Sequence, residues 1–169
     1  MKKLVLALLL MLLQLCTACS ETTYHSNEEI GRAFQRHKST FENVAVSAVG
    51  ENSGYIHKLD AEGQETECGD SGCKLMEADG LHIHLQREMS DTELRHIAEA
   101  ALALMENVDI ESISFSQEAV RFHLKDESEY SWDPTIVYWR ADDADEGKIG
   151  YGEAVCRLAD HWYAALITR

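Results

Sequence analysis

The sequence predicts an α+β domain in which two amphipathic helices pack on one face of an antiparallel β-sheet of about five or six strands. Two segments begin with a capping box and then carry apolar residues at helical spacing. Several other segments alternate between apolar and polar residues, so one face of the sheet is expected to be buried and the other wet. These segments follow one another without intervening helices, which favours antiparallel pairing.

The first helix is predicted to begin after Ser26 and to end near Gly50. Its capping box is Ser26 with Glu29, and the stripe that follows is Ile30, Phe34, His37, Phe41, Val44 and Ala48. The second helix opens with the capping box of Ser90 and Glu93, and its stripe is Leu94, Ile97, Ala101, Leu104 and Val108. Each helix is therefore expected to bury one face.

The remaining segments are predicted as strands because they are rich in β-branched and aromatic residues or alternate in polarity. They are Tyr55–Leu59, Leu81–Gln86, Ser112–Ser116, Val120–Lys125, Thr135–Arg140 and His161–Ile167. A short turn at Gln117 and Glu118 is expected to join the third and fourth strands in a hairpin. The last segment contains two alanines, so a helix is the alternative there.

Length and charge limit the classes of protein to which the chain can belong. Its 169 residues, of which 45% are hydrophobic, fit a single domain over residues 26–169. The chain has 15 Lys and Arg against 30 Asp and Glu, a formal net charge of -15. Nucleic-acid binding needs clustered cations at the phosphates, so no nucleic-acid partner is expected.

The N-terminus has the features of a secretory signal. Two lysines precede an apolar run from Leu4 to Leu15, interrupted only at Gln14. A helix of that length would be about 18 Å long, whereas a bilayer core is about 30 Å thick. The run therefore indicates export rather than a permanent membrane-spanning helix.

The residues after this run, Thr17, Ala18 and Cys19, resemble the lipobox of bacterial lipoproteins. The resemblance implies that residues 1–18 are a signal peptide, that Cys19 is acylated, and that residues 19–25 form a short tether. Ser20 resembles the outer-membrane address of enteric-type lipoproteins, which implies a lipid-anchored protein of the outer membrane that faces the periplasm. A plain signal peptide cleaved near Ala18, or an uncleaved anchor, is the alternative.

Short motifs in the rest of the chain point the same way. They are Phe34-Gln35-Arg36-His37-Lys38, Phe41-Glu42, Val137-Tyr138-Trp139 and Asp160-His161-Trp162-Tyr163. Together they resemble a group of small, uncharacterised bacterial envelope proteins and lipoproteins. The resemblance implies the fold and the location and adds nothing about chemistry.

The cysteines of the exported part are expected to be structural. Cys68 and Cys73 flank a short loop with two glycines and are predicted to form a disulfide, since exported proteins meet oxidants. The intervening Gly-Asp-Ser-Gly resembles the nucleophile segment of chymotrypsin-like proteases, with Ser71 as nucleophile, but that family needs glycine at position 73. A redox pair usually has two intervening residues rather than four. Cys156 is predicted to be a buried thiol.

The acidic segment Asp142–Glu153 can be aligned with a twelve-residue calcium loop. Asp142, Gly147, Ile149 and Glu153 occupy the positions that the EF-hand pattern requires. Ala144 removes one ligand oxygen, and the preceding segment is predicted as a strand where an EF-hand needs a helix. We therefore expect a solvated hairpin loop, with a weak cation site as the alternative.

Three histidines are candidates for a metal site. His82 and His84 alternate with apolar residues and so share one face of their strand, and His123 is a candidate for the same wet face. Three imidazoles in such an arrangement bind zinc or copper. The pairing of these strands cannot be obtained from the sequence, so no metal ligand and no cofactor is assigned. His37, on the first helix, is expected at the boundary of the core.

The sequence contains no catalytic constellation that we recognise, so the chain is not expected to be an enzyme. The leading hypothesis is a lipid-anchored envelope protein that binds a protein partner or acts as an accessory module, for example a toxin-neutralising immunity protein. The alternative is a periplasmic metal-binding protein that uses His82, His84 and His123.

Overall fold

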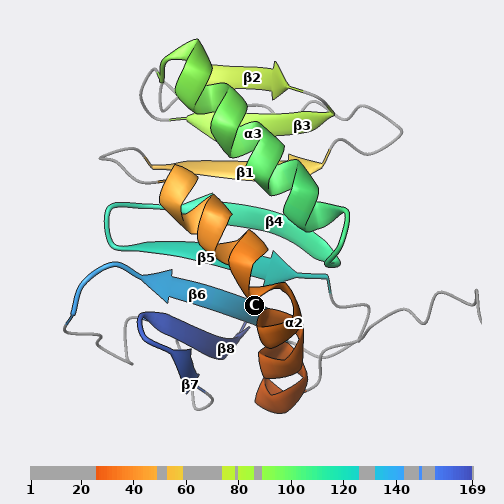
Figure 1. The fold of residues 1–169 in the computed structure, drawn as a ribbon, viewed down its shortest axis with the longest axis vertical. Coiled ribbons are helices and arrows are strands. Elements are labelled where there is room, and N and C mark those ends of the chain that lie inside the picture. The colour runs from red at the N-terminus through yellow and green to blue at the C-terminus, as the bar shows by residue number, and fades with distance from the viewer. Residues whose placement is uncertain are drawn as a thin grey trace, which may run out of the picture.

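A computed structural model describes residues 26–48, 53–58, 74–78, 80–85, 89–125, 132–142, 149 and 155–168. Within these ranges the chain forms two helices and one eight-stranded sheet (Figure 1). The helices are α2 (Asn27–Ser47) and α3 (Asp91–Met105). The strands are β1 (Gly54–Lys58), β2 (Lys74–Ala78), β3 (Leu81–Leu85), β4 (Ile110–Phe115), β5 (Ala119–Leu124), β6 (Trp132–Trp139), β7 (Val155–Ala159) and β8 (Trp162–Thr168).

The predicted α+β class is confirmed, but the predicted number of strands is wrong. The strand order is β2-β3-β1-β4-β5-β6-β8-β7, and every neighbouring pair is antiparallel. The two strands that the sequence did not reveal, β2 and β7, are the two edges of the sheet. Edge strands have one hydrogen-bonded neighbour, and tertiary context specifies them more than propensity does.

A row of apolar side chains crosses the sheet from β3 to β8. Cα pairing aligns Ile83 with Ile56, Ile56 with Ile113, and then continues through Phe122, Ile136 and Ala164. All six side chains are fully buried in one core cluster that also contains the buried faces of both helices. Because side chains alternate along a strand, this row determines which residues lie on the opposite face.

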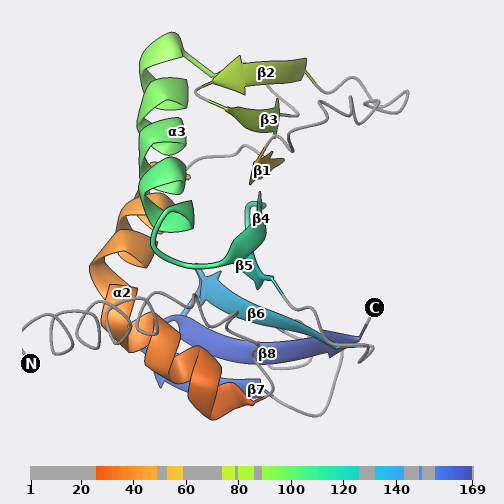
Figure 2. The same cartoon turned by 90° about the vertical axis from the view of Figure 1, so that its right-hand side faces the viewer.

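Aromatic rings join α2 to strands β5 and β8 of the sheet. The ring of Trp162 on β8 lies 4.9 Å from that of Phe34, and the ring of Phe122 on β5 lies 5.0 Å from that of Phe41. α2 contacts β6, β7 and β8, whereas α3 contacts β3 and β4. Figure 2 shows the helix layer and the sheet in profile. Such ring pairs contribute about 0.5–1.5 kcal/mol each beyond their buried area.

The opposite face of the sheet has two different parts. Near β6 and β8 it is apolar, with a small cluster formed by Ala119, Val137, Trp139, Ile149, Tyr163 and Ala165. Across β3, β1, β4 and β5 it carries a polar row of paired residues, His82, His57, Ser112 and His123. His82 and Ser112 are among the buried polar residues of the described chain.

Two cations of the sheet bind the C-terminal ends of the helices. Neither helix has a basic residue in its own last turn. Lys58, at the end of β1, donates from Nζ to the carbonyl of Met105 at 2.7 Å. Arg140, which follows β6, donates from Nη2 to the carbonyl of Ala48 at the end of α2. Terminal carbonyls of a helix lack intrahelical partners and carry the negative end of its dipole, so both contacts are favourable.

We therefore expect Lys58→Met and Arg140→Met each to lower the free energy of unfolding by about 1 kcal/mol, because each leaves a helix end without its cation. Urea denaturation followed by circular dichroism measures this. Lys38→Met is the matched control, since Lys38 forms an exposed ion pair with Glu42 within α2 and should cost less than about 0.5 kcal/mol. Equal losses in all three variants would contradict the assignment.

Candidate metal centre

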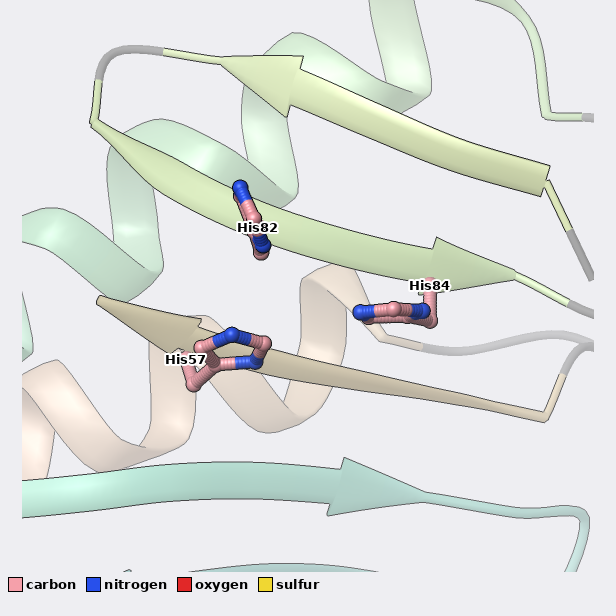
Figure 3. Close-up of side chains that lie close together, drawn as sticks. All are labelled: His57, His82 and His84. Carbon is pink, nitrogen blue, oxygen red and sulfur yellow. The ribbon is translucent and has the colours of Figure 1, made fainter. Parts of the chain in front are cut away.

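Three histidines from two neighbouring strands come together on the polar part of the sheet. β1 and β3 pair antiparallel, and this pairing aligns His57 with His82 and Tyr55 with His84. Ile56 and Ile83 belong to the buried row, so the histidines beside them project to the other side. Figure 3 shows the three imidazoles in front of the two strands, with the helices behind the sheet.

The rings of His57, His82 and His84 are close enough to share one ion. Their centroids are separated by 5.1 Å between His57 and His82, 5.6 Å between His57 and His84, and 6.2 Å between His82 and His84. One nitrogen from each ring lies within 4.8 Å of the other two. Zn–N bonds of about 2.0–2.1 Å place tetrahedral nitrogens about 3.3 Å apart. To hold one zinc ion, the nitrogens would therefore have to approach one another by at most about 1.5 Å.

Burial favours the neutral form of His84, which is the form that binds metal. His82 is 1% exposed, and the other two rings are half-buried. Burial lowers the pKa of His84 below its ordinary value, and the nearby imidazole of His82 lowers the pKa further. Neutral imidazole has a free nitrogen lone pair for a cation. The lowered pKa of His84 therefore favours the form of this residue that can bind a metal ion.

His123 lies on the same face as predicted, but outside this cluster. It is the Cα partner of Ser112, which is in turn the partner of His57, so β4 separates the two histidines. His57 and His123 are therefore separated by two strand spacings, which amount to about 10 Å. Its Nε2 lies 3.2 Å from Oγ of Ser114. Of the three histidines in the alternative hypothesis, the structure thus brings His82 and His84 together with His57 and places His123 outside their cluster.

The sequence does contain a local signal for His57. The predicted strand Tyr55–Leu59 contains Ile56, and period-two alternation then places His57 on the face opposite that isoleucine. What the sequence lacked was the pairing of β1 with β3, because a long stretch of chain separates them. Only the folded sheet brings His57 next to His82.

His123 is expected to make the stability of the metal-free protein depend on pH. Burial lowers the pKa of His123; Arg121 acts in the same direction, whereas Asp133 and Glu111 oppose it. As the pH falls through the ordinary histidine pKa of 6.5, this imidazole therefore binds a proton in the unfolded chain before it does so in the native chain. Acidification accordingly lowers the free energy of unfolding.

We expect the loss of unfolding free energy between pH 7.5 and pH 5.5 (about one unit on either side of the ordinary histidine pKa) to be smaller in His123→Gln than in the unaltered chain. Urea denaturation in the presence of a chelator measures it. His96→Gln, at an exposed position of α3, is the control and should retain the full pH dependence. A His123→Gln profile that parallels that of the unaltered chain would show that His123 does not take part.

The predicted lipidation and disulfide cysteines and most of the acidic segment lie outside the residues that the structure describes. Cys19, Cys68 and Cys73 lie outside the described residues. Of the segment Asp142–Glu153 only Asp142 and Ile149 are described, so its cation hypothesis is not tested. Asp142 is exposed, and its carboxylate lies 3.6 Å from Nε2 of His161.

The prediction of a buried Cys156 was wrong, because its thiol is exposed. The residue lies in β7, which has β8 on one side only. An edge strand of this kind leaves more of its side chains in water than a central strand does. His37 is half-buried, as expected of a boundary residue, and its backbone angles (φ -121°, ψ 22°) kink α2.

Comparison with known proteins identifies no relative. No protein-family model matches the chain, and no curated protein or solved structure is significantly similar to it. Among the residues that the structure describes, no helix is both long enough and apolar enough to cross a membrane. The resemblance to envelope lipoproteins stays a prediction.

Proposed function

We propose that the chain is a lipid-anchored protein of the bacterial cell envelope that binds a transition-metal ion, Zn²⁺ or Cu²⁺, through His57, His82 and His84. The observation that carries the proposal is the convergence of three imidazole nitrogens within 4.8 Å of one another. Imidazole is a preferred ligand of both ions. The lipobox around Cys19 supports the anchor, and Ser20 supports an outer-membrane location facing the periplasm.

The proposal assigns the two faces of the sheet to different tasks. The two helices cover one face, supported by their contacts with the strands and by the shared core cluster. The opposite face then remains for the ion. The binding of a protein partner stays a prediction. We favour the metal-binding hypothesis over the protein-binding hypothesis because the three histidines form a defined set of ligands.

Loss of one ligand should weaken metal binding strongly. Removal of an outer partner of a metal ligand already costs about 10–100-fold in affinity, so His57→Ala and His84→Gln should each weaken Cu²⁺ binding by at least about 100-fold. Titration of the detergent-solubilised full chain by calorimetry measures the affinity. Electron paramagnetic resonance of bound Cu²⁺ should show coupling to imidazole nitrogens, and this coupling should diminish in both variants.

Two matched variants control this experiment. His123→Ala removes a histidine from the same face and His96→Ala removes an exposed one from α3, and neither should change Cu²⁺ affinity. His57 and His84 are half-buried, so their replacement disturbs folding less than that of the buried His82. Cu²⁺ binding that survives unchanged in His57→Ala and His84→Gln would refute the site.

The lipid anchor is tested separately. Expression of the full chain in an exporting bacterium should yield a mature N-terminus at Cys19 with acyl chains, visible as added mass in the N-terminal peptide. Cys19→Ser should abolish this mass and release the protein from the membrane fraction. Cys16→Ser is the matched control, because Cys16 lies three residues earlier and should not be needed. Acylation that follows Cys16 instead would overturn the assignment.

A further inference from the structure

We propose that Ser114, His123 and Asp133 form a second site on the polar face of the sheet, which hydrolyses small carboxylic esters with Ser114 as the nucleophile. This activity goes beyond metal binding, because the two sites share no residue. The histidine cluster lies on β1 and β3, whereas the second site lies on β4, β5 and β6. The activity also departs from the sequence-based expectation that the chain is not an enzyme.

The contact between Ser114 and His123 is the first observation. Oγ of Ser114 lies 3.2 Å from Nε2 of His123, and both residues are half-buried. They come from the paired strands β4 and β5, whose register makes them diagonal neighbours on one face. A serine becomes a strong nucleophile when a base within hydrogen-bond distance, about 2.6–3.2 Å, takes its proton. The separation is therefore that of a nucleophile and its general base.

His123 has the protonation state that a general base needs. Burial has the largest effect on this residue and lowers its pKa below the ordinary value of 6.5. Asp133 and Glu111 oppose this change, whereas Arg121 adds to it. At neutral pH the imidazole is therefore mainly neutral. Its Nε2 can accept a proton when Nδ1 carries the ring hydrogen.

Asp133 is the third member of the site. His123 pairs with Thr135 of β6, and Asp133 precedes Thr135 by two residues, so all three share one face of the sheet. Among the charged groups that act on His123, the carboxylate of Asp133 has the largest effect. A carboxylate beside the base favours the tautomer with hydrogen on Nδ1 and stabilises the imidazolium that forms in the reaction. Asp133 therefore acts as a positioning residue.

Arg121 and Tyr55 flank Ser114 on the neighbouring strands. Arg121 is the Cα partner of Ser114 in β5, and Tyr55 is its partner in β1. Side chains paired in this way lie on the same face, with Cβ atoms about 4.5–5.5 Å apart. The guanidinium of Arg121 thus places positive charge beside Ser114, where a substrate carbonyl would develop negative charge. Tyr55 is 39% exposed, so water and a small substrate reach this part of the face.

The reaction follows from these positions. Oγ of Ser114 attacks the carbonyl carbon of the ester while Nε2 of His123 takes the hydroxyl proton. The bond to the leaving oxygen then breaks, and that oxygen receives the proton from His123 and departs as an alcohol. A water that gives a proton to His123 cleaves the acyl-serine to the free acid, and His123 returns that proton to Oγ. An ester is the expected substrate because an alkoxide leaves more readily than an amide nitrogen does.

The test uses a fluorophosphonate probe, which bonds covalently to activated serines, and p-nitrophenyl acetate as substrate. The detergent-solubilised full chain is assayed with EDTA, so that no ion at the histidine cluster contributes. We expect the probe mass on the peptide that contains Ser114, and a loss of both labelling and hydrolysis in Ser114→Ala. His123→Gln should slow both by at least about 100-fold, the usual contribution of a general base. Ser112→Ala is the matched control on the same face of β4 and should retain both.

The pH dependence of labelling tests the role of Asp133. In the unaltered chain the labelling rate should rise with pH through the pKa of His123, because only neutral imidazole accepts the proton. Asp133→Asn removes a carboxylate that raises this pKa, so the midpoint of the profile should move to lower pH. A slower rate with an unmoved midpoint would show that Asp133 has a structural role only.

The outcomes separate this site from the metal site. Labelling of Ser114 that is slowed in His123→Gln and retained in His57→Ala supports the proposal. Failure to label Ser114, or equal labelling in His123→Gln, overturns it. Hydrolysis that requires a metal ion and is lost in His57→Ala would belong to the histidine cluster and would also overturn it. Cu²⁺ affinity is measured independently, so either proposal can fail alone.

Discussion

The alignment of Ile83, Ile56 and Ile113 across β3, β1 and β4 is the constraint on which the rest of the structure depends. All three side chains are fully buried in the core cluster that also contains buried residues of both helices. A shift of one residue in the pairing would turn every side chain of the shifted strand to the other face. The isoleucines would then lose their burial, at about 1.5–3 kcal/mol each. Burial of the isoleucines thus fixes the register of β3, β1 and β4. This register in turn places His57 next to His82.

The positions of the histidines in the candidate site follow from the positions of the buried isoleucines. His57 and His82 precede or follow buried isoleucines by one position, and the pleat sends them to the opposite face. Their spacing is that of cross-strand neighbours, which suits a shared ion. A bound ion would also join β1 to β3, so the site and the pairing of these two strands would stabilise one another.

The two layers are linked at their polar ends as well as through the core. Lys58 and Arg140 extend from strand ends to carbonyl groups at the C-termini of α3 and α2. Lys58 directly follows His57 in β1, so one short strand contributes to the core, to the candidate site and to the end of a helix. Small changes in β1 are therefore expected to affect the packing of the core and the geometry of the candidate site together.

The sequence by itself determined the elements whose signals are local. Capping boxes at Ser26 and Ser90, with the helical spacing behind them, were enough for both helices, whose observed starts at Asn27 and Asp91 follow directly. Six of the strands were recognisable because alternation and β-branched residues act within a few positions. That His82 and His84 share a face followed from the same period of two.

Tertiary structure alone decided the strand order, the two edge strands and the third histidine. Pairing joins residues that are distant in the chain, and its free energy comes from contacts between strands rather than from the residues of one strand. For that reason β2 and β7 were missed, and Cys156 was expected in the core although β7 leaves it exposed. For the same reason His57, which the sequence could place on a face but not beside a partner, became a candidate ligand only when β1 paired with β3.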